Sequence, residues 1–162
     1  MITRSRLREG LRIGTLAGLA MIPLAAIFRA RGLRVNEYGR KTLALLVGET
    51  KPPFDLVLTF LQHLVISWAA ALPLLVVFER IVDRRTRLLV GTAYGAGFYV
   101  ALNSLALPIT FGDPTPWALG FETIYPSLAV HLVYGAVLGW TARPPDSSIP
   151  AAPRRGGTSI GR

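Results

Sequence analysis

The sequence contains no cysteine among its 162 residues. That absence excludes disulfide bonds, thiolate metal ligands and a cysteine nucleophile. Charge is also scarce, because only 17% of the residues are charged, with 9 acidic against 18 basic side chains and a net charge of +9. By contrast, 51% of the residues are hydrophobic, and the mean hydropathy is +0.44. A soluble nucleic-acid-binding protein would carry much more charge, so we predict a membrane protein with basic loops and no nucleic-acid partner.

Four segments are apolar and long enough to cross a bilayer, which takes about 20 residues. Polar residues are sparse within them, whereas a helix of a soluble bundle would show a polar face. Backbone groups in lipid must bond within the segment, so each segment is expected to be helical. The prediction is an all-α integral membrane bundle of four transmembrane helices in one domain, residues 1–142. These helices are expected at about 11–28, 55–78, 88–108 and 121–142.

The first apolar segment follows Arg4, Arg6 and Arg8, as the apolar stretch of a secretory signal peptide also would. No small-x-small cleavage site leads into a soluble domain after it. We therefore expect this segment to remain as the first transmembrane helix.

The segments outside these helices differ in character. The first connection holds apolar residues between Asn36 and Gly48, a pattern that predicts a short amphipathic helix lying at the membrane interface. The end of the chain, residues 143–162, is rich in proline, glycine and arginine. That composition predicts a disordered basic tail.

The basic residues are unevenly distributed along the chain. Twelve of the eighteen lie before or at the start of the first helix, between the second and third helices, or in the tail. Cytoplasmic loops carry the excess of Lys and Arg, so we expect both termini in the cytoplasm and the protein in a bacterial inner membrane. The other six basic residues lie in the first connection and oppose this orientation.

Three of the predicted helices carry glycines four residues apart, a spacing that lets helix backbones approach closely. We therefore expect these glycines at helix contacts, either within one chain or between two copies. They are Gly14 with Gly18, Gly91 with Gly95, and Gly135 with Gly139.

Polar residues are also spaced by four, which places them on one face of each helix. With a rise of 1.5 Å per residue, His63, Tyr99 and His131 all lie roughly 12–15 Å from the outer surface, with Asn103 one turn above. These four residues form a predicted polar layer inside the bundle. Glu122 is expected at its outer mouth.

His63 and His131 are the only histidines, and three roles remain open for them. They could simply hydrogen-bond neighbouring helices, they could exchange protons or contact a solute, or they could together ligate a haem. A zinc site would need further ligands, which the sequence does not supply nearby. No phosphate-binding loop, nucleophile elbow or HExxH motif is present. We expect neither an enzyme nor a bound cofactor or metal.

The second half of the chain carries a series of landmarks. His63 and Ser67 lie on the second helix, Trp117 lies in a proline-rich turn, and Glu122 and His131 follow. Over roughly residues 56–141 this order resembles the YagU-like family of bacterial inner-membrane proteins, whose function is uncharacterised. The resemblance implies that His63, Glu122 and His131 belong to a shared pattern, and it implies a link to acid stress.

These observations favour a small non-enzymatic membrane protein whose polar layer responds to pH or handles protons or a small solute. Protonation of the histidines at acidic outer pH would then shift the packing of the helices. The alternative is an accessory or structural subunit that docks into a larger membrane complex. A homo-oligomer is the other assembly we consider.

Overall fold

The structure is a computed structural model that describes residues 4–35, 38–49 and 51–143. The described part contains helices and no strand. The helices are α1 (Arg4–Ala30), α2 (Tyr38–Val47), α3 (Phe54–Phe78), α4 (Arg84–Phe98), the π-helix η1 (Tyr99–Ala106), α5 (Leu107–Phe111), α6 (Pro116–Leu119) and α7 (Phe121–Thr141).

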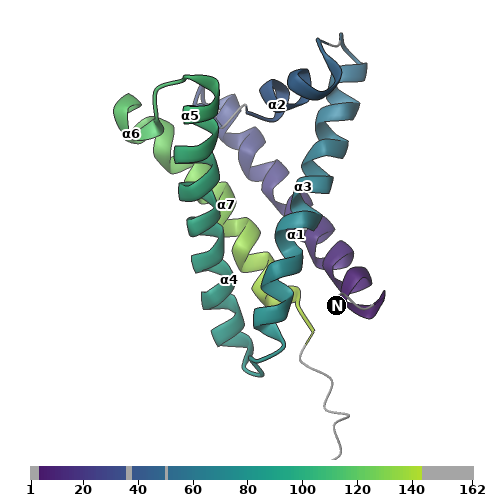
Figure 1. Cartoon of the computed structure of the whole chain (residues 1–162). Helices are drawn as coiled ribbons and strands as arrows, with labels where there is room; N and C mark the ends of the chain where they lie inside the picture. Colours follow the sequence, from purple (N-terminus) through teal and green to yellow (C-terminus); the bar gives the residue numbers. More distant parts are fainter. Residues whose placement is uncertain (1–3, 36–37, 50, 144–162) are drawn as a thin grey trace, which may run out of the picture.

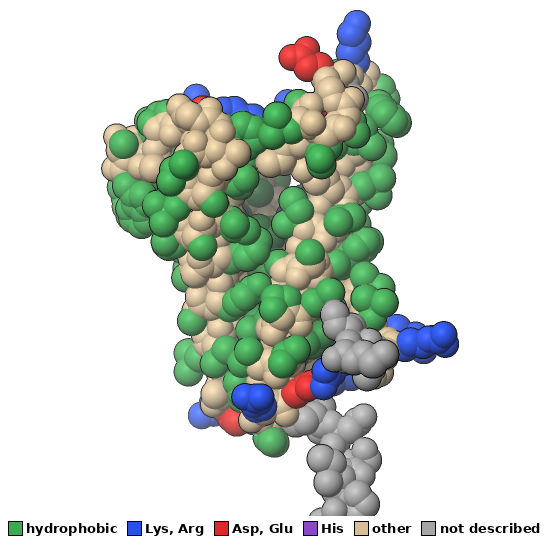
Figure 2. All heavy atoms as spheres, in the orientation of Figure 1, with side chains coloured by type: hydrophobic (Ala, Val, Ile, Leu, Met, Phe, Trp, Pro, Cys, Tyr) green, Lys and Arg blue, Asp and Glu red, His purple; other side chains and the backbone are tan. Residues whose placement is uncertain are grey.

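Four helices in the described part are long and apolar enough to cross a membrane: α1, α3, the continuous helix Arg84–Phe111 and α7. The prediction of an all-α bundle with four membrane-spanning segments is therefore confirmed. Large apolar side chains such as Leu89, Ile109 and Phe121 are 70–72% exposed on its outside. Figure 2 shows apolar side chains over the middle of the bundle and Lys and Arg side chains near its two ends. This distribution suits a lipid environment.

The four spans do not pack equally. Helix α4 packs closely on α7, and α1 packs on both α3 and α7, whereas α3 and α4 barely touch. The core lies between α1, α3 and α7, where Ile13, Ala71 and Leu138 are fully buried. Figure 2 shows a hollow between the column formed by α4, η1 and α5 and the column formed by α3.

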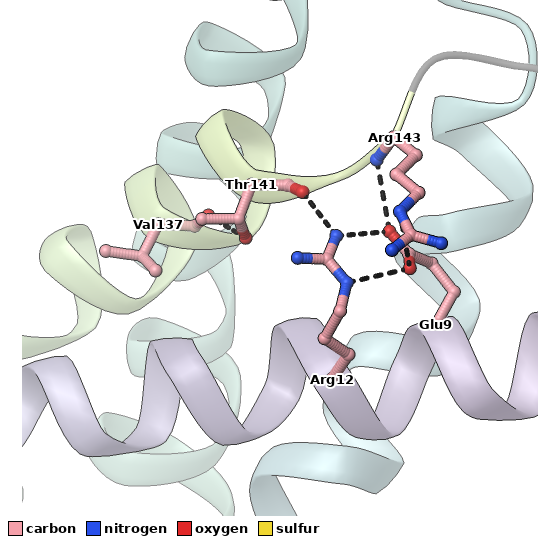
Figure 3. A network of polar contacts seen from close by, with 5 residues as sticks. All are labelled: Glu9, Arg12, Val137, Thr141 and Arg143. Carbon is pink, nitrogen blue, oxygen red and sulfur yellow. Dashed lines mark hydrogen bonds and ion pairs between the residues drawn. The ribbon is translucent and has the colours of Figure 1, made fainter.

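The start of α1 and the end of α7 lie at the same end of the bundle (Figure 1). Arg12 joins them, because its guanidinium donates to the Glu9 carboxylate and, at 2.6 Å, to the backbone carbonyl of Thr141 (Figure 3). The backbone N–H of Arg143 donates to the same carboxylate at 3.1 Å. Charged side chains thus close this end of the bundle.

The third span begins at Asp83, whose carboxylate accepts hydrogen bonds from the backbone N–H and the hydroxyl of Thr86. This is an N-terminal cap. The hydrogen bond from the Thr86 N–H contributes most, and the one from its hydroxyl comes second. Together they hold the pKa of Asp83 below its ordinary value.

The same span contains a π-helical stretch that the sequence did not suggest. Pro108 has no N–H to donate to the carbonyl of Ser104, and its ring would crowd that carbonyl in a regular α-helix. The widened turn avoids this conflict, and Leu107 donates instead to the carbonyl of Leu102, five residues earlier. The span then continues past the predicted end, through α5 to Phe111.

The short helix predicted in the first connection is present as α2, and it lies across the bundle end opposite the termini (Figure 1). Tyr38 stacks on Phe111, and Lys41 pairs with Asp113. Burial, together with the charge and hydrogen bond of Asp113, raises the pKa of Tyr38. Helix α2 therefore links α3 to the end of α5. Asn36, at the start of the predicted short helix, and residues 144–162 of the predicted disordered tail lie outside the described residues.

Candidate functional site

A small, half-open cavity of about 60 Å³ lies among four helices of the bundle. A volume of this size has room for a few water molecules. Both histidines of the chain line it, so the structure brings them to one place. The lining residues are Met21, His63, Ile66, Ser67, Ala70, Phe98, His131 and Tyr134.

His131 is buried on α7 and uses both ring nitrogens. Nδ1 lies 2.6 Å from the backbone carbonyl of Ser127, which can only accept, so Nδ1 carries a hydrogen. Nε2 lies 2.7 Å from the side-chain amide nitrogen of Asn103, which donates, so Nε2 accepts. The hydrogen bonds therefore specify a neutral imidazole with its proton on Nδ1. Adding a proton to Nε2 would require the Asn103 amide to turn and present its oxygen.

The π-helix η1 places two predicted layer residues against His131. Asn103 makes the bond just described, and the fully buried ring of Tyr99 lies 5.6 Å from the imidazole between ring centres. The hydroxyl of Tyr99 is buried without a hydrogen-bond partner among the described residues. Buried polar groups are nearly always hydrogen-bonded, to protein or to ordered water.

His63 approaches the cavity from α3. Its Nε2 lies 3.0 Å from the backbone carbonyl of Gly18 on α1, so Nε2 donates its hydrogen there. This bond leaves Nδ1 as the ring atom that can take up a proton. His63 and His131 line the same cavity from different helices. The predicted layer thus has two parts: His131 with Asn103 and Tyr99, and His63 across the cavity.

Glu122 lies apart from these residues. It is exposed in the first turn of α7, roughly 13 Å along the helix from His131 at 1.5 Å per residue. None of the residues that line the cavity carries a carboxylate. The ionisable groups that face it are His63 and His131, with Tyr134 on its wall and Tyr94 and Tyr99 beside it. A proton taken up here would have no acidic side chain beside it.

All six predicted glycines lie at contacts between helices of the same chain. A Cβ atom on Gly95 would stand 2.1 Å from the carbonyl oxygen of His131, and one on Gly135 would stand 2.0 Å from that of Gly91. Gly91 and Gly139 face the backbone of the opposite helix in the same way. On α1, Gly14 and Gly18 face the backbone and the side chain of Ser67, respectively. Helices α4 and α7 therefore meet backbone to backbone directly beside His131.

Two tyrosines near the cavity had no role in the sequence-based prediction. Tyr134 donates from its hydroxyl to the carbonyl of Ser67 at 2.6 Å, and Tyr94 donates to that of Ala70 at 2.7 Å. Both tie another helix to α3 at the level of the cavity. The available signal was a hydroxyl at membrane depth, which needs a partner once buried.

Ligation of a haem through Nε2 of both histidines would break two hydrogen bonds, because Nε2 of His63 bonds the Gly18 carbonyl and Nε2 of His131 bonds the Asn103 amide. Within the described residues no group of three His, Cys, Asp or Glu side chains is arranged to hold a metal ion.

The fold and this interior site define a multi-pass helical protein with the length and composition of a membrane protein. The chain belongs to a family described as "Family of unknown function (DUF6789)", which matches residues 5–147. No curated protein and no solved structure gave a match. Nothing in these comparisons links the chain to the YagU-like family.

Proposed function

We propose that this protein is a non-enzymatic, pH-responsive membrane protein that takes up protons at His63 and His131. The observation that carries the proposal is that the only two histidines of the chain line one cavity from different helices. Ionisable residues at membrane depth are rare, and they tend to serve a function. Imidazole is also the side chain whose charge ordinarily changes near neutral pH.

The hydrogen bonds suggest how protonation would change the packing. A proton on Nε2 of His131 turns that atom into a donor, so the Asn103 amide must rotate or move away. Asn103 lies in the π-helix, a rare form with hydrogen bonds between residues five apart that often occurs at functional sites. Two like charges on His63 and His131 would also repel across the cavity. Protonation would thus push α3 away from η1 and α7.

This proposal includes a bacterial inner membrane with both termini in the cytoplasm. Acidity on the other side of that membrane would be the signal, in keeping with the link to acid stress that the resemblance to the YagU-like family implies.

The test is a titration of the two imidazoles in lipid nanodiscs. Nitrogen-15 labelling of histidine gives two sets of ring signals, and the variants His63→Gln and His131→Gln assign them. Between about pH 8 and about pH 5, which bracket the ordinary histidine pKa, we expect at least one ring to become charged.

A distance between spin labels on α3 and α4 should increase over the same range. The double variant His63→Gln/His131→Gln is the control and should show no change in distance. Rings that stay neutral to about pH 5, or a double variant that responds like the wild type, would contradict the proposal.

A further inference from the structure

One face of α3 carries polar side chains from its beginning to the cavity. Asp55, Thr59, His63 and Ser67 recur every four residues, which places them in one row along the helix. Gln62 lies beside this row. Helix α2 contacts Asp55 and Thr59 at the start of this row, whereas His63 and Ser67 line the cavity. A polar path therefore runs from α2 to the histidines.

Three side-chain oxygens along this path are buried and have no hydrogen-bond partner among the described residues: Asp55 Oδ1, Thr59 Oγ1 and Gln62 Oε1. Buried polar atoms are nearly always hydrogen-bonded, to protein or to ordered water. Three such oxygens lie within two turns of one helix face, and each can accept a hydrogen bond from water.

Helix α2 forms the cover of this place. A Cβ atom on Gly39 would stand 3.6 Å from Thr59 Cγ2 and 3.8 Å from Gln62 Oε1, so the α2 backbone passes close over both side chains. Arg40 forms an ion pair of 3.7 Å with Asp55, and the Gln62 amide donates to Thr42 Oγ1 at 2.7 Å. The oxygens are thus enclosed between two helices and do not face lipid.

The charges favour water over a bound metal cation. Asp55 is the only carboxylate among the three residues, and Arg40 already lies against it. The charged and titratable groups facing the path are Asp55 and His63 on α3 and Arg40 on α2, while Lys41 on α2 pairs with Asp113. A second cation beside Arg40 would be repelled, whereas water can bridge such oxygens without added charge.

We propose that Asp55, Thr59 and Gln62 hold a short chain of water that connects the α2 end of the bundle to His63, and that protons reach the histidine cavity along it. The destination of this path rests on the proposed function, but the presence of water in it does not. The site then has two parts, the histidine cavity and this path.

The test uses the absence of cysteine in the chain. Single cysteines are introduced along the path as Asp55→Cys, Thr59→Cys and His63→Cys. Matched controls at nearly the same depth, on the lipid-facing side, are Val57→Cys, Leu61→Cys and Val65→Cys, whose native side chains are 50–55% exposed. Each variant is treated in nanodiscs with methanethiosulfonate ethylammonium, a small water-soluble reagent.

The thiolate is the reacting species, and it forms only where water is present, so path cysteines should react about tenfold or more faster than their controls. The rate should fall in the order Asp55→Cys, Thr59→Cys, His63→Cys. Equal rates at Thr59→Cys and Leu61→Cys would overturn the path. A reactive His63→Cys beside an unreactive Thr59→Cys would also overturn it, because water would then reach His63 by another way.

A second measurement needs no substitution. Water-edited solid-state NMR of the unmodified protein transfers magnetisation from water to nearby side chains. We expect Thr59 and His63 to gain signal faster than Leu61 and Val65, and equal build-up would overturn the path. If the path is dry while the imidazoles still titrate, only the path fails. If the path is wet while the imidazoles stay neutral, only the proposed function fails.

Discussion

The side-chain amide of Asn103 donates a 2.7 Å hydrogen bond to Nε2 of His131 inside the bundle. Asn103→Ala removes this donor and leaves Nε2 buried without a partner. We expect a loss of about 1–2 kcal/mol in the free energy of unfolding, measured by SDS titration in mixed micelles. The nitrogen-15 signal of Nε2 should also move towards the value of an unbonded ring nitrogen.

The neighbouring Ser104 provides the control for this prediction. Its hydroxyl is fully buried in the same π-helix but has no hydrogen-bond partner among the described residues. Ser104→Ala should therefore leave the stability unchanged or raise it slightly, because it removes a buried polar atom that makes no bond. Equal losses for the two variants would contradict the prediction, because the hydrogen bond of Asn103 would then add nothing to the free energy of unfolding.

The contact between α4 and α7 predicts a strong effect of one methyl group. A Cβ on Gly135 would stand 2.0 Å from the carbonyl oxygen of Gly91, so Gly135→Ala must push the two backbones apart. We expect a loss of about 2–3 kcal/mol or more in the same unfolding assay. Gly97→Ala is the control, because nothing lies within 4 Å of a Cβ at that exposed position of α4. It should leave the stability unchanged or increase it.

The sequence predicted the four spans because apolar runs of that length have few alternatives to a membrane helix. It also placed His63, Tyr99 and His131 near one depth, with Asn103 one turn above, since helical rise converts residue counts into distance. In the structure the side chains of Asn103 and Tyr99 both lie against that of His131. Sequence spacing could not show that His63 would instead hydrogen-bond Gly18 on α1, because that contact depends on which helices are neighbours.

The π-helix could not be predicted from sequence patterns, for a different reason. The predicted third helix ended at Pro108, and the chain instead widened one turn and continued as a helix to Phe111. That widened turn carries Asn103, so the local response to one proline helps determine where the partner of His131 lies. Likewise, three glycine pairs offered several pairings of helices, and only packing selected α4 against α7.

The cap of α4 predicts a dependence of stability on pH. The Thr86 N–H, and then its hydroxyl, hold the pKa of Asp83 below its ordinary value in the folded protein. The stabilisation is fully present above the pKa of the unfolded chain, about 3.9, and is lost as the pH falls through the lower folded value. Asp83→Ala should therefore be less stable than the wild type at neutral pH, and the difference should shrink only below about pH 4.

The substitution Asp83→Asn separates the charge from the hydrogen bond. Asparagine keeps an oxygen that can accept from the Thr86 N–H, but it does not titrate. Its stability relative to Asp83→Ala should stay constant between about pH 7 and about pH 3. Unfolding curves in mild detergent at several pH values give both comparisons, and a wild-type difference that grows on acidification would contradict the predicted sign.

Arg12 holds the start of α1 and the end of α7 together. Its guanidinium bonds the Glu9 carboxylate and the Thr141 carbonyl, so Arg12→Gln should loosen α7 from α1 (Figure 3). Because the side chain is 36% exposed, we expect a loss of only about 1 kcal/mol. The loss should be smaller in about 1 M salt, which screens exposed charges.

Arg8→Gln is the matched control on the same helix, since Arg8 is exposed and forms no ion pair within the described residues. Hydrogen exchange at the amide of Arg143, which donates to Glu9, should quicken in Arg12→Gln and not in Arg8→Gln. Equal exchange in the two variants would mean that Arg12 does not hold the end of α7 in place.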